Sequence, residues 1–194
     1  KMRGLHAAQV AAALDALSII RGDELTVVDI GDSAGTHGQY LRALAPEGKM
    51  ARVLSVNLDP VAIDKIRAKG GDAVLGRAED LDVAEYNAAL FCLFETLEHL
   101  SDPLRFLHRL ATGAAAHVLV SVPYRRHSRF GDDHLRLAES AMPEKLTAEQ
   151  VHIYEFSPAD WALLARFAGY RVVFQRIYRQ YPRRSIFRLT APLW

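Results

Sequence analysis

The sequence predicts a three-layer α/β sandwich, built on a mostly parallel sheet of seven strands that ends in an antiparallel hairpin. Two observations support this fold class. Short apolar runs rich in β-branched residues alternate with segments of helical periodicity, which is typical of a parallel sheet covered by helices on both faces. Near the C-terminus, two further runs flank the turn-like segment 180–183, which indicates a hairpin. The 194 residues, 50% of them apolar, suit one domain spanning 1–194.

The helical segments begin and end at residues that usually bound helices. Apolar side chains at helical spacing extend over residues 5–20, and Gly22 ends this element, so residues 1–22 supply an N-terminal helix. Asp59 and Ser157 each precede a proline and are expected to be N-caps. The helices are expected at 5–20, 39–44, 60–68, 103–111 and 158–167.

The predicted strands are too short for helices and apolar enough to be buried on both faces. They are expected at 25–30, 51–56, 73–75, 88–94, 117–122, 171–178 and 185–189. The segment 124–150 between the fifth strand and the last helix is irregular and rich in charge. Because long loops after a strand are usually functional, we expect 124–150 to form a lid or an acceptor loop.

Composition excludes several classes of protein. A single cysteine, Cys92, cannot form an internal disulfide, and its apolar neighbours predict a buried, inert thiol. No segment reaches the ~18 apolar residues that a membrane-spanning helix needs. Polar residues interrupt the N-terminal helix and argue against a signal peptide, so a cytoplasmic protein is expected. The net charge of +1 argues against broad nucleic-acid binding.

The loop after the first strand is the first candidate for ligand binding. In an open parallel sheet, ligands bind beyond the carboxyl ends of the strands, next to the reversal of strand order. Gly31 and Gly35 would let the backbone approach a ligand closely, and the following helix start offers N–H groups to an anion. The spacing is not the G-x-G-x-x-G of nicotinamide enzymes. Taken alone, the loop is also compatible with a purely structural glycine turn.

Motifs at this strand end and at later ones continue the pattern. They are Asp29-Ile30-Gly31 with Gly35, Asn57-Leu58-Asp59-Pro60, Ala78-Glu79-Asp80-Leu81, the segment from Glu95 to Pro103, and Ser121-Val122-Pro123. With these motifs in this order, residues 25–178 resemble a class I S-adenosylmethionine-dependent methyltransferase of the ubiquinone-biosynthesis type, which has a Rossmann-like sheet.

The resemblance implies a binding site for S-adenosyl-L-methionine. Asp29 and Gly31 would lie against the methionine end of the cofactor, Asn57 against the ribose hydroxyls and Asp80 against the adenine amino group. Asp59 is the rival of Asn57 for the ribose. The full set of implied cofactor-binding residues is Asp29, Gly31, Asp32, Ser33, Gly35, Asn57, Leu58, Glu79, Asp80 and Phe94.

The sequence departs from the family pattern at two positions. Ser33 stands where a glycine is common, and Asn57 stands where an acid usually ends the second strand. An asparagine can still donate to and accept from a diol, so cofactor binding is expected to be retained.

Glu95, Glu98 and His99 have the spacing of ligands on one helical turn. With His152 as a fourth ligand they would hold Mg²⁺ or Mn²⁺, and the set resembles that of metal-dependent small-RNA 2′-O-methyltransferases. The alternative is that the two glutamates are solvated acids favoured by the helix dipole, and that His99 packs or acts as a base.

Histidines are the candidates for a general base, because the ordinary pKa of imidazole suits removal of a hydroxyl proton. His99, His127 and His134 are the candidates. The remaining histidines that precede residue 120, namely His6, His37, His108 and His117, are expected on surfaces or at strand starts, without a role.

These observations favour an S-adenosylmethionine-dependent methyltransferase that acts on a small molecule at oxygen. Arg125, Arg126 and Arg129 cluster after the fifth strand and would suit an anionic acceptor. The alternative is that nearby acids balance these arginines, which would then form an ordinary charged surface. Two alternatives stay open: an inactive cofactor-binding partner module, favoured by Ser33 and Asn57, and a metal-assisted RNA 2′-hydroxyl methyltransferase. The sequence leaves the oligomeric state open.

Overall fold

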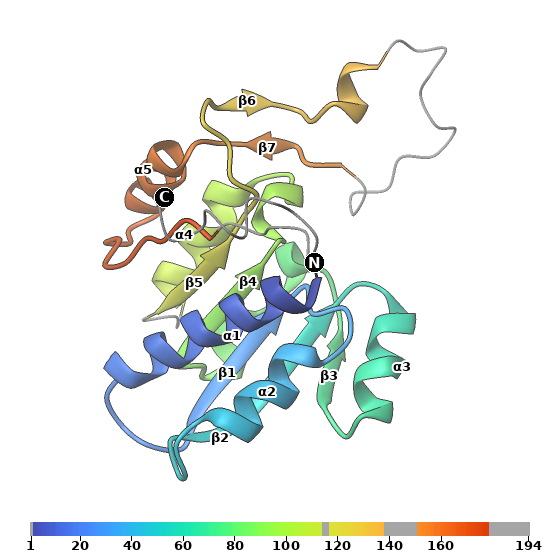
Figure 1. The fold of residues 1–194 in the computed structure, drawn as a ribbon, viewed down its shortest axis with the longest axis vertical. Coiled ribbons are helices and arrows are strands. Elements are labelled where there is room, and N and C mark those ends of the chain that lie inside the picture. Colours follow the sequence, from blue (N-terminus) through green and yellow to red (C-terminus); the bar gives the residue numbers. More distant parts are fainter. Residues whose placement is uncertain (1, 114–116, 138–150, 179–194) are drawn as a thin grey trace, which may run out of the picture.

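A computed structural model describes residues 2–113, 117–137 and 151–178 and shows a central sheet of five parallel strands (Figure 1). The strand order is β3-β2-β1-β4-β5. β1 therefore lies in the middle, and the strand order reverses at it. The strands are β1 Leu25–Ile30, β2 Met50–Asn57, β3 Asp72–Leu75, β4 Leu90–Phe94 and β5 Val118–Ser121.

Helices cover both faces of this sheet, as the sequence predicts (Figure 1). Val27 and Cys92 point into the core on the side of α1 and α2, whereas Val28 and Phe91 point into the core on the side of α4 and α5. This alternation of fully buried side chains confirms the three layers. The helices are α1 Met2–Ile19, α2 Thr36–Leu44, α3 Pro60–Ala68, α4 Pro103–Gly113 and α5 Pro158–Phe167. In the described ranges, the short 3₁₀ turns are η1 Ala78–Asp80, η2 Val83–Tyr86, η3 Leu97–His99 and η4 His134–Arg136.

Two of the predicted helix starts are confirmed by their hydrogen bonds. The Asp59 carboxylate accepts from the Val61 N–H at 2.9 Å, and the Ser157 hydroxyl accepts from the Asp160 N–H at 3.3 Å. Each side chain satisfies an amide that the first helical turn leaves without a partner. Asp59 is thus engaged as an N-cap.

The expected C-terminal hairpin is not formed in the described residues. Residues 171–178 carry no strand, and Val173 and Ile177 are more than half exposed. β-Branched residues form a strand only where a partner strand and a packed face exist, and the predicted partner 185–189 lies outside the described residues. Within the described residues, the central sheet therefore has five strands, and the expected seven-stranded sheet is not shown. An antiparallel pair forms elsewhere, between β6 Arg129–Phe130 and β7 Tyr154–Glu155.

Cys92 is fully buried in β4, as predicted. Burial raises the pKa of its thiol well above the ordinary value, which keeps it protonated and unreactive. None of the helices in the described ranges is both long and apolar enough to cross a membrane.

The core on the α4 side can be tested with two leucines of one helix. Leu110 is fully buried, whereas Leu104 is 42% exposed. Leu110→Ala should lower the free energy of unfolding by about 2–5 kcal/mol, because it removes buried surface and leaves a cavity. Leu104→Ala should change it by less than about 1 kcal/mol. Urea unfolding followed by circular dichroism measures both, and equal losses would contradict this packing.

Candidate functional site

The loop after β1 is organised by the buried carboxylate of Asp32. One oxygen accepts from the amides of Ala34 and Gly35 at 3.0 and 2.8 Å, and the other accepts from the Ser55 hydroxyl at 2.7 Å. Both oxygens of Asp32 thus hold the loop in place and tie it to β2. Among the residues expected at the cofactor, Asp32 therefore shapes the loop, while the neighbouring Ser33 side chain is exposed.

Gly31 is required by a contact that the sequence does not reveal. Its φ is +89°, and a Cβ built there would lie 2.2 Å from the Thr96 hydroxyl oxygen. The Thr96 hydroxyl in turn donates to the Ile30 carbonyl at 3.0 Å, which joins the ends of β1 and β4. The Thr96 side chain therefore occupies the space that a side chain at position 31 would need. The sequence analysis did not single out Thr96. Gly35 adopts the left-handed conformation, with φ +69°, as α2 begins.

Asp29, at the end of β1, is a buried carboxyl with one oxygen in use. Oδ2 lies 2.9 Å from Nδ1 of His37, while Oδ1 is buried and has no hydrogen-bond partner among the described residues. Burial raises the pKa of Asp29 to about 6, although His37 acts in the opposite direction. A buried oxygen without a partner marks a place where a donor from a ligand fits.

His37 is itself buried, so the expectation that it lies at a surface is wrong. It is 7% exposed, and its ring lies 4.6 Å from the ring of Phe94, between centroids. Burial lowers the pKa of His37, but the hydrogen bond and the charge of Asp29 outweigh that effect, and the pKa is raised overall. The sequence spacing gave no sign of this, because the buried side of the first turn of α2 depends on the packing of α1.

Asn57 joins the two loops that follow β1 and β2. Its Nδ2 donates to the Asp32 carbonyl at 3.0 Å, and its Oδ1 accepts from the Asp59 N–H at 2.8 Å. One N–H of the Asn57 amide is left for a ligand. Leu58 next to it is 48% exposed.

The segment expected beside adenine is the short turn η1. Arg109 of α4 donates to the carbonyls of Glu79 and Leu81 and so fixes the path of this turn. The Asp80 side chain is exposed and lies 4.0 Å from the guanidinium of Arg77. Its carboxylate is accessible to a ligand.

The backbone conformation of Glu95 turns this residue away from the other expected metal ligands. Its φ is +50°, an uncommon conformation for a residue other than glycine, and η3 begins only at Leu97. The spacing predicted one helical turn from Glu95 to His99, but this kink removes Glu95 from that turn. The Glu95 carboxylate instead accepts from the Ser121 hydroxyl at 2.8 Å.

The structure does bring Glu98, His99 and His152 together, with potential ligand atoms within 4.8 Å of one another. Glu98 is 1% exposed, and neither carboxyl oxygen has a hydrogen-bond partner in the described parts of the chain. Burial, assisted by the charge of Glu95, raises the pKa of Glu98 to about 8. His99 donates from Nδ1 to the Val151 carbonyl at 2.9 Å, so its neutral form carries the lone pair on Nε2, 3.9 Å from Glu98.

His152 reaches this place because the chain around β6 and β7 folds over the end of β4. The Ile153 amide donates to the Glu98 carbonyl at 2.9 Å, and the Asp132 amide donates to the His152 carbonyl at 3.0 Å. The rings of His99 and His152 lie 4.8 Å apart, between centroids. The approach of His152 to His99 that the metal hypothesis requires is therefore present.

The arginines after β5 are largely balanced by acids. Arg125 and Arg129 both donate to Glu155, which is 3% exposed. Although burial alone would raise it, the pKa of Glu155 is lowered by these two arginines. Of the other candidate bases, His127 is exposed in the bend after β5, and the side chain of His134 lies outside the described structure.

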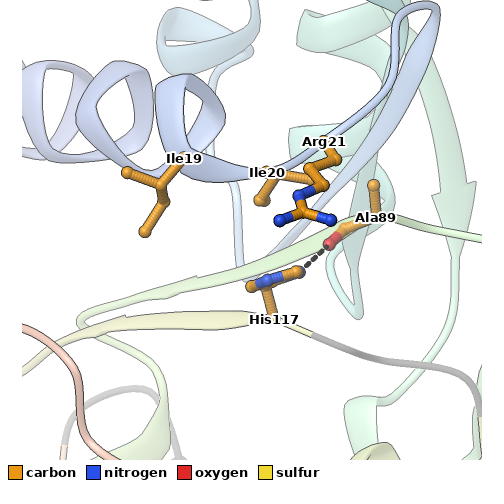
Figure 2. A pocket seen from close by; sticks show the side chains of 5 residues that line it. All are labelled: Ile19, Ile20, Arg21, Ala89 and His117. Carbon is orange, nitrogen blue, oxygen red and sulfur yellow. Dashed lines mark hydrogen bonds between the residues drawn. The ribbon is translucent and has the colours of Figure 1, made fainter.

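A separate cavity of about 450 Å³ lies at the opposite end of the sheet (Figure 2). It is lined by Ile19, Ile20, Arg21, Ala89 and His117. These residues precede β1, β4 and β5 and therefore lie at the amino ends of the strands. The cavity is remote from the strand ends that gather Asp29, Glu98 and His99.

Comparison with known proteins identifies the family and the fold. The family model described as "Methyltransferase domain" matches residues 2–175. A Haloferax volcanii putative methyltransferase, solved in complex with the Trm112 methyltransferase activator, is 19% identical with a TM-score of 0.61; the match covers 89% of this chain and 73% of that one.

Two further solved structures have a similar fold. An S-adenosylmethionine-dependent methyltransferase from Aquifex aeolicus is 17% identical with a TM-score of 0.52, over 82% of this chain and 78% of that one. The N-terminal domain of EvdMO1 with S-adenosylhomocysteine bound is 13% identical with a TM-score of 0.58, over 84% of this chain and 71% of that one. No curated protein matches the chain.

The contact between Gly31 and Thr96 can be tested against a second glycine of similar conformation. Gly48 has φ +74°, and nothing lies within 4 Å of a Cβ built there. Gly48→Ala should therefore cost only backbone strain, about 1–2 kcal/mol of unfolding free energy. Gly31→Ala should cost at least about 1 kcal/mol more, because Thr96 must move. Adding Thr96→Ala should recover part of that loss in urea unfolding; no recovery would show that Thr96 is not the obstacle.

Proposed function

Because this chain belongs to the methyltransferase-domain family and is an S-adenosylmethionine-dependent methyltransferase, we propose that it methylates a hydroxyl group of a small-molecule acceptor. The observation that carries the choice of oxygen is the fixed imidazole of His99. Its Nδ1 is held by the Val151 carbonyl at the carboxyl edge of the sheet, where Asp29 also lies. A hydroxyl must lose a proton as it is methylated, and an imidazole with Nε2 as its basic atom suits that task.

The residues at the ends of β1 and β2 fit the cofactor. The Asp29 oxygen without a partner suits an ammonium group, such as the one at the methionine end. The remaining N–H of Asn57 suits a ribose hydroxyl, and the exposed carboxylate of Asp80 suits the adenine amino group. Ser33 is exposed, and Leu58 and Phe94 offer apolar contact beside these groups. Gly31, Gly35 and Glu79 contribute their backbone.

When bound, the cofactor supplies an electrophilic methyl group on a sulfonium. His99 would take the acceptor's hydroxyl proton on Nε2 while the acceptor oxygen bonds to the methyl carbon. The carbon–sulfur electron pair would stay on sulfur, so that the proton on His99 balances the charge of the step. The chain's remaining contribution is orientation, because holding both reactants in line accounts for much of such a rate enhancement.

A divalent cation fits the same acceptor region, and we propose it as the second form of the mechanism. The supporting observation is Glu98, whose two buried oxygens lack hydrogen-bond partners beside His99 and His152. Two imidazoles and one carboxylate favour Mn²⁺ over Mg²⁺, which prefers oxygen ligands. A metal there would lower the pKa of a coordinated hydroxyl, and His99 would then be a ligand rather than a base.

The cofactor site can be tested at Asp29. Asp29→Asn should weaken S-adenosylmethionine binding about tenfold or more, because a charge-assisted hydrogen bond is lost. Because the pKa of Asp29 is raised to about 6, the parent's affinity should also fall as pH drops through 6 and the carboxylate is protonated. Titration calorimetry measures both effects. The control Asp72→Asn, at an exposed ion pair with Arg52, should bind like the parent.

The absence of cofactor binding by the parent at millimolar concentration would contradict the proposed function. Unchanged affinity in Asp29→Asn would contradict this placement of the methionine end.

The two forms of the mechanism separate at His152. If Mn²⁺ is used, His152→Ala should abolish Mn²⁺ binding, measured by electron paramagnetic resonance, as well as metal-stimulated turnover. Cofactor affinity should stay nearly unchanged, because the cofactor contacts lie on other loops. His117→Ala, at the opposite end of the sheet, serves as the control. Turnover that resists a chelator and survives His152→Ala, but not His99→Ala, would contradict the metal and support His99 as the base.

A further inference from the structure

A continuous chain of side-chain hydrogen bonds crosses the site by way of helix α1. Asp29 Oδ2 lies 2.9 Å from His37 Nδ1, and His37 Nε2 lies 3.0 Å from Gln9 Oε1. Gln9 Nε2 donates to the Ser121 hydroxyl at 2.8 Å, and that hydroxyl donates to Glu95 at 2.8 Å. Gln9 is 4% exposed and is the member that α1 contributes. This series of hydrogen bonds joins Asp29, at the end of β1, to Glu95, the residue that follows β4.

The direction of each hydrogen bond in this chain follows from its Glu95 end. An ionised carboxylate can only accept a hydrogen bond, so the Ser121 hydroxyl donates its single proton to Glu95. The Ser121 oxygen must then accept from Gln9, which turns the amide N–H₂ toward Ser121. The Gln9 carbonyl consequently faces His37, and a carbonyl can only accept. His37 must therefore carry a proton on Nε2.

This requirement fixes the charge of the Asp29–His37 pair. With Nε2 protonated, the neutral imidazole has its lone pair on Nδ1, which would face an ionised Asp29 at 2.9 Å with no proton between them. The pair must hold one further proton, shared between Asp29 Oδ2 and His37 Nδ1. Whichever atom carries it, the pair is neutral overall. Losing a proton would leave a bare Nε2 against the Gln9 carbonyl.

We propose that Gln9 is a positioning residue that keeps Nε2 of His37 protonated, so that the methionine end of the cofactor meets a neutral Asp29–His37 pair rather than an anionic one. The role of the pair in cofactor binding rests on the proposed function, whereas the protonation of His37 does not. Other titratable groups also face this pair: His6 of α1, whose ring lies 5.0 Å from that of His37, and Asp32 of the first loop. The raised pKa of His37 agrees with the assignment.

Substitutions at Gln9 should move the titration of His37 in opposite directions. Gln9→Met is similar in size and removes the carbonyl, so the Nε2 proton should be lost at a pH about one unit lower, corresponding to one hydrogen bond to a charged group. Gln9→Glu keeps an acceptor and adds negative charge, so the proton should be retained to higher pH. Ser121→Ala should give part of the Gln9→Met shift, because the amide loses the bond that orients it. Nitrogen-15 NMR of the two His37 ring nitrogens, without cofactor, measures each titration.

Cofactor affinity should follow the same shifts. In the parent, affinity for S-adenosylmethionine should rise at the pH where the pair becomes anionic, because the cofactor is cationic. That rise should move to lower pH in Gln9→Met and to higher pH in Gln9→Glu, as measured by calorimetry across pH. Val10→Ala, a buried neighbour on the same helix, should lower thermal stability and leave the His37 titration unchanged.

The outcomes separate the two claims. An unchanged His37 titration in Gln9→Met, or the same shift in Val10→Ala, would overturn the role of Gln9. If the Gln9 variants show the expected His37 shifts but the parent binds no S-adenosylmethionine, the role of Gln9 is supported and the proposed function is overturned.

Discussion

The central place of β1 is the constraint on which the rest of the structure depends. Because β1 pairs in parallel with β2 on one edge and β4 on the other, the strand order reverses at it. The chain leaves β1 toward α2 on one face of the sheet and leaves β4 toward α4 on the other. The two connections diverge, and ligands bind in the crevice that such a divergence opens. Asp29 and Glu95 lie at the two sides of that divergence because of this topology alone.

Buried polar side chains at this edge mostly satisfy one another, which makes the exceptions informative. Asp32 uses both of its oxygens and Asn57 uses both ends of its amide, so these residues shape the loops. Asp29 and Glu98 are the carboxyl groups in the described ranges that keep a buried oxygen without a hydrogen bond. The pKa of each is raised by burial, to about 6 and about 8 respectively. Unsatisfied carboxyls of this kind concentrate where a ligand completes the structure.

The sequence predicted the features that depend on local chemistry and missed those set by distant contacts. The five central strands and the caps Asp59 and Ser157 follow from short-range patterns, and the structure confirms them. A side chain at position 31 would collide with Thr96, which lies far along the chain. The burial of His37 likewise depends on a distant element, α1. The kink at Glu95 breaks the helical spacing that predicted Glu95, Glu98 and His99 on one turn. Residues 171–178 have strand-like composition, but composition does not supply a pairing partner.

The two carboxyls solve the same electrostatic problem in different ways. A buried charge is costly unless it is paired or neutralised. Asp29 meets this requirement within the protein, because His37 lies at hydrogen-bonding distance and the proton that we infer for this pair makes it neutral. Glu98 has an imidazole no nearer than 3.9 Å, beyond hydrogen-bonding distance, so it must either keep its own proton or hold a cation with His99 and His152. If Asp29 holds the methionine end, as we propose, the cofactor meets a neutral pair, whereas Glu98 beside His99 and His152 keeps a choice between proton and cation. That choice is what distinguishes a histidine base from a metal-assisted methyl transfer.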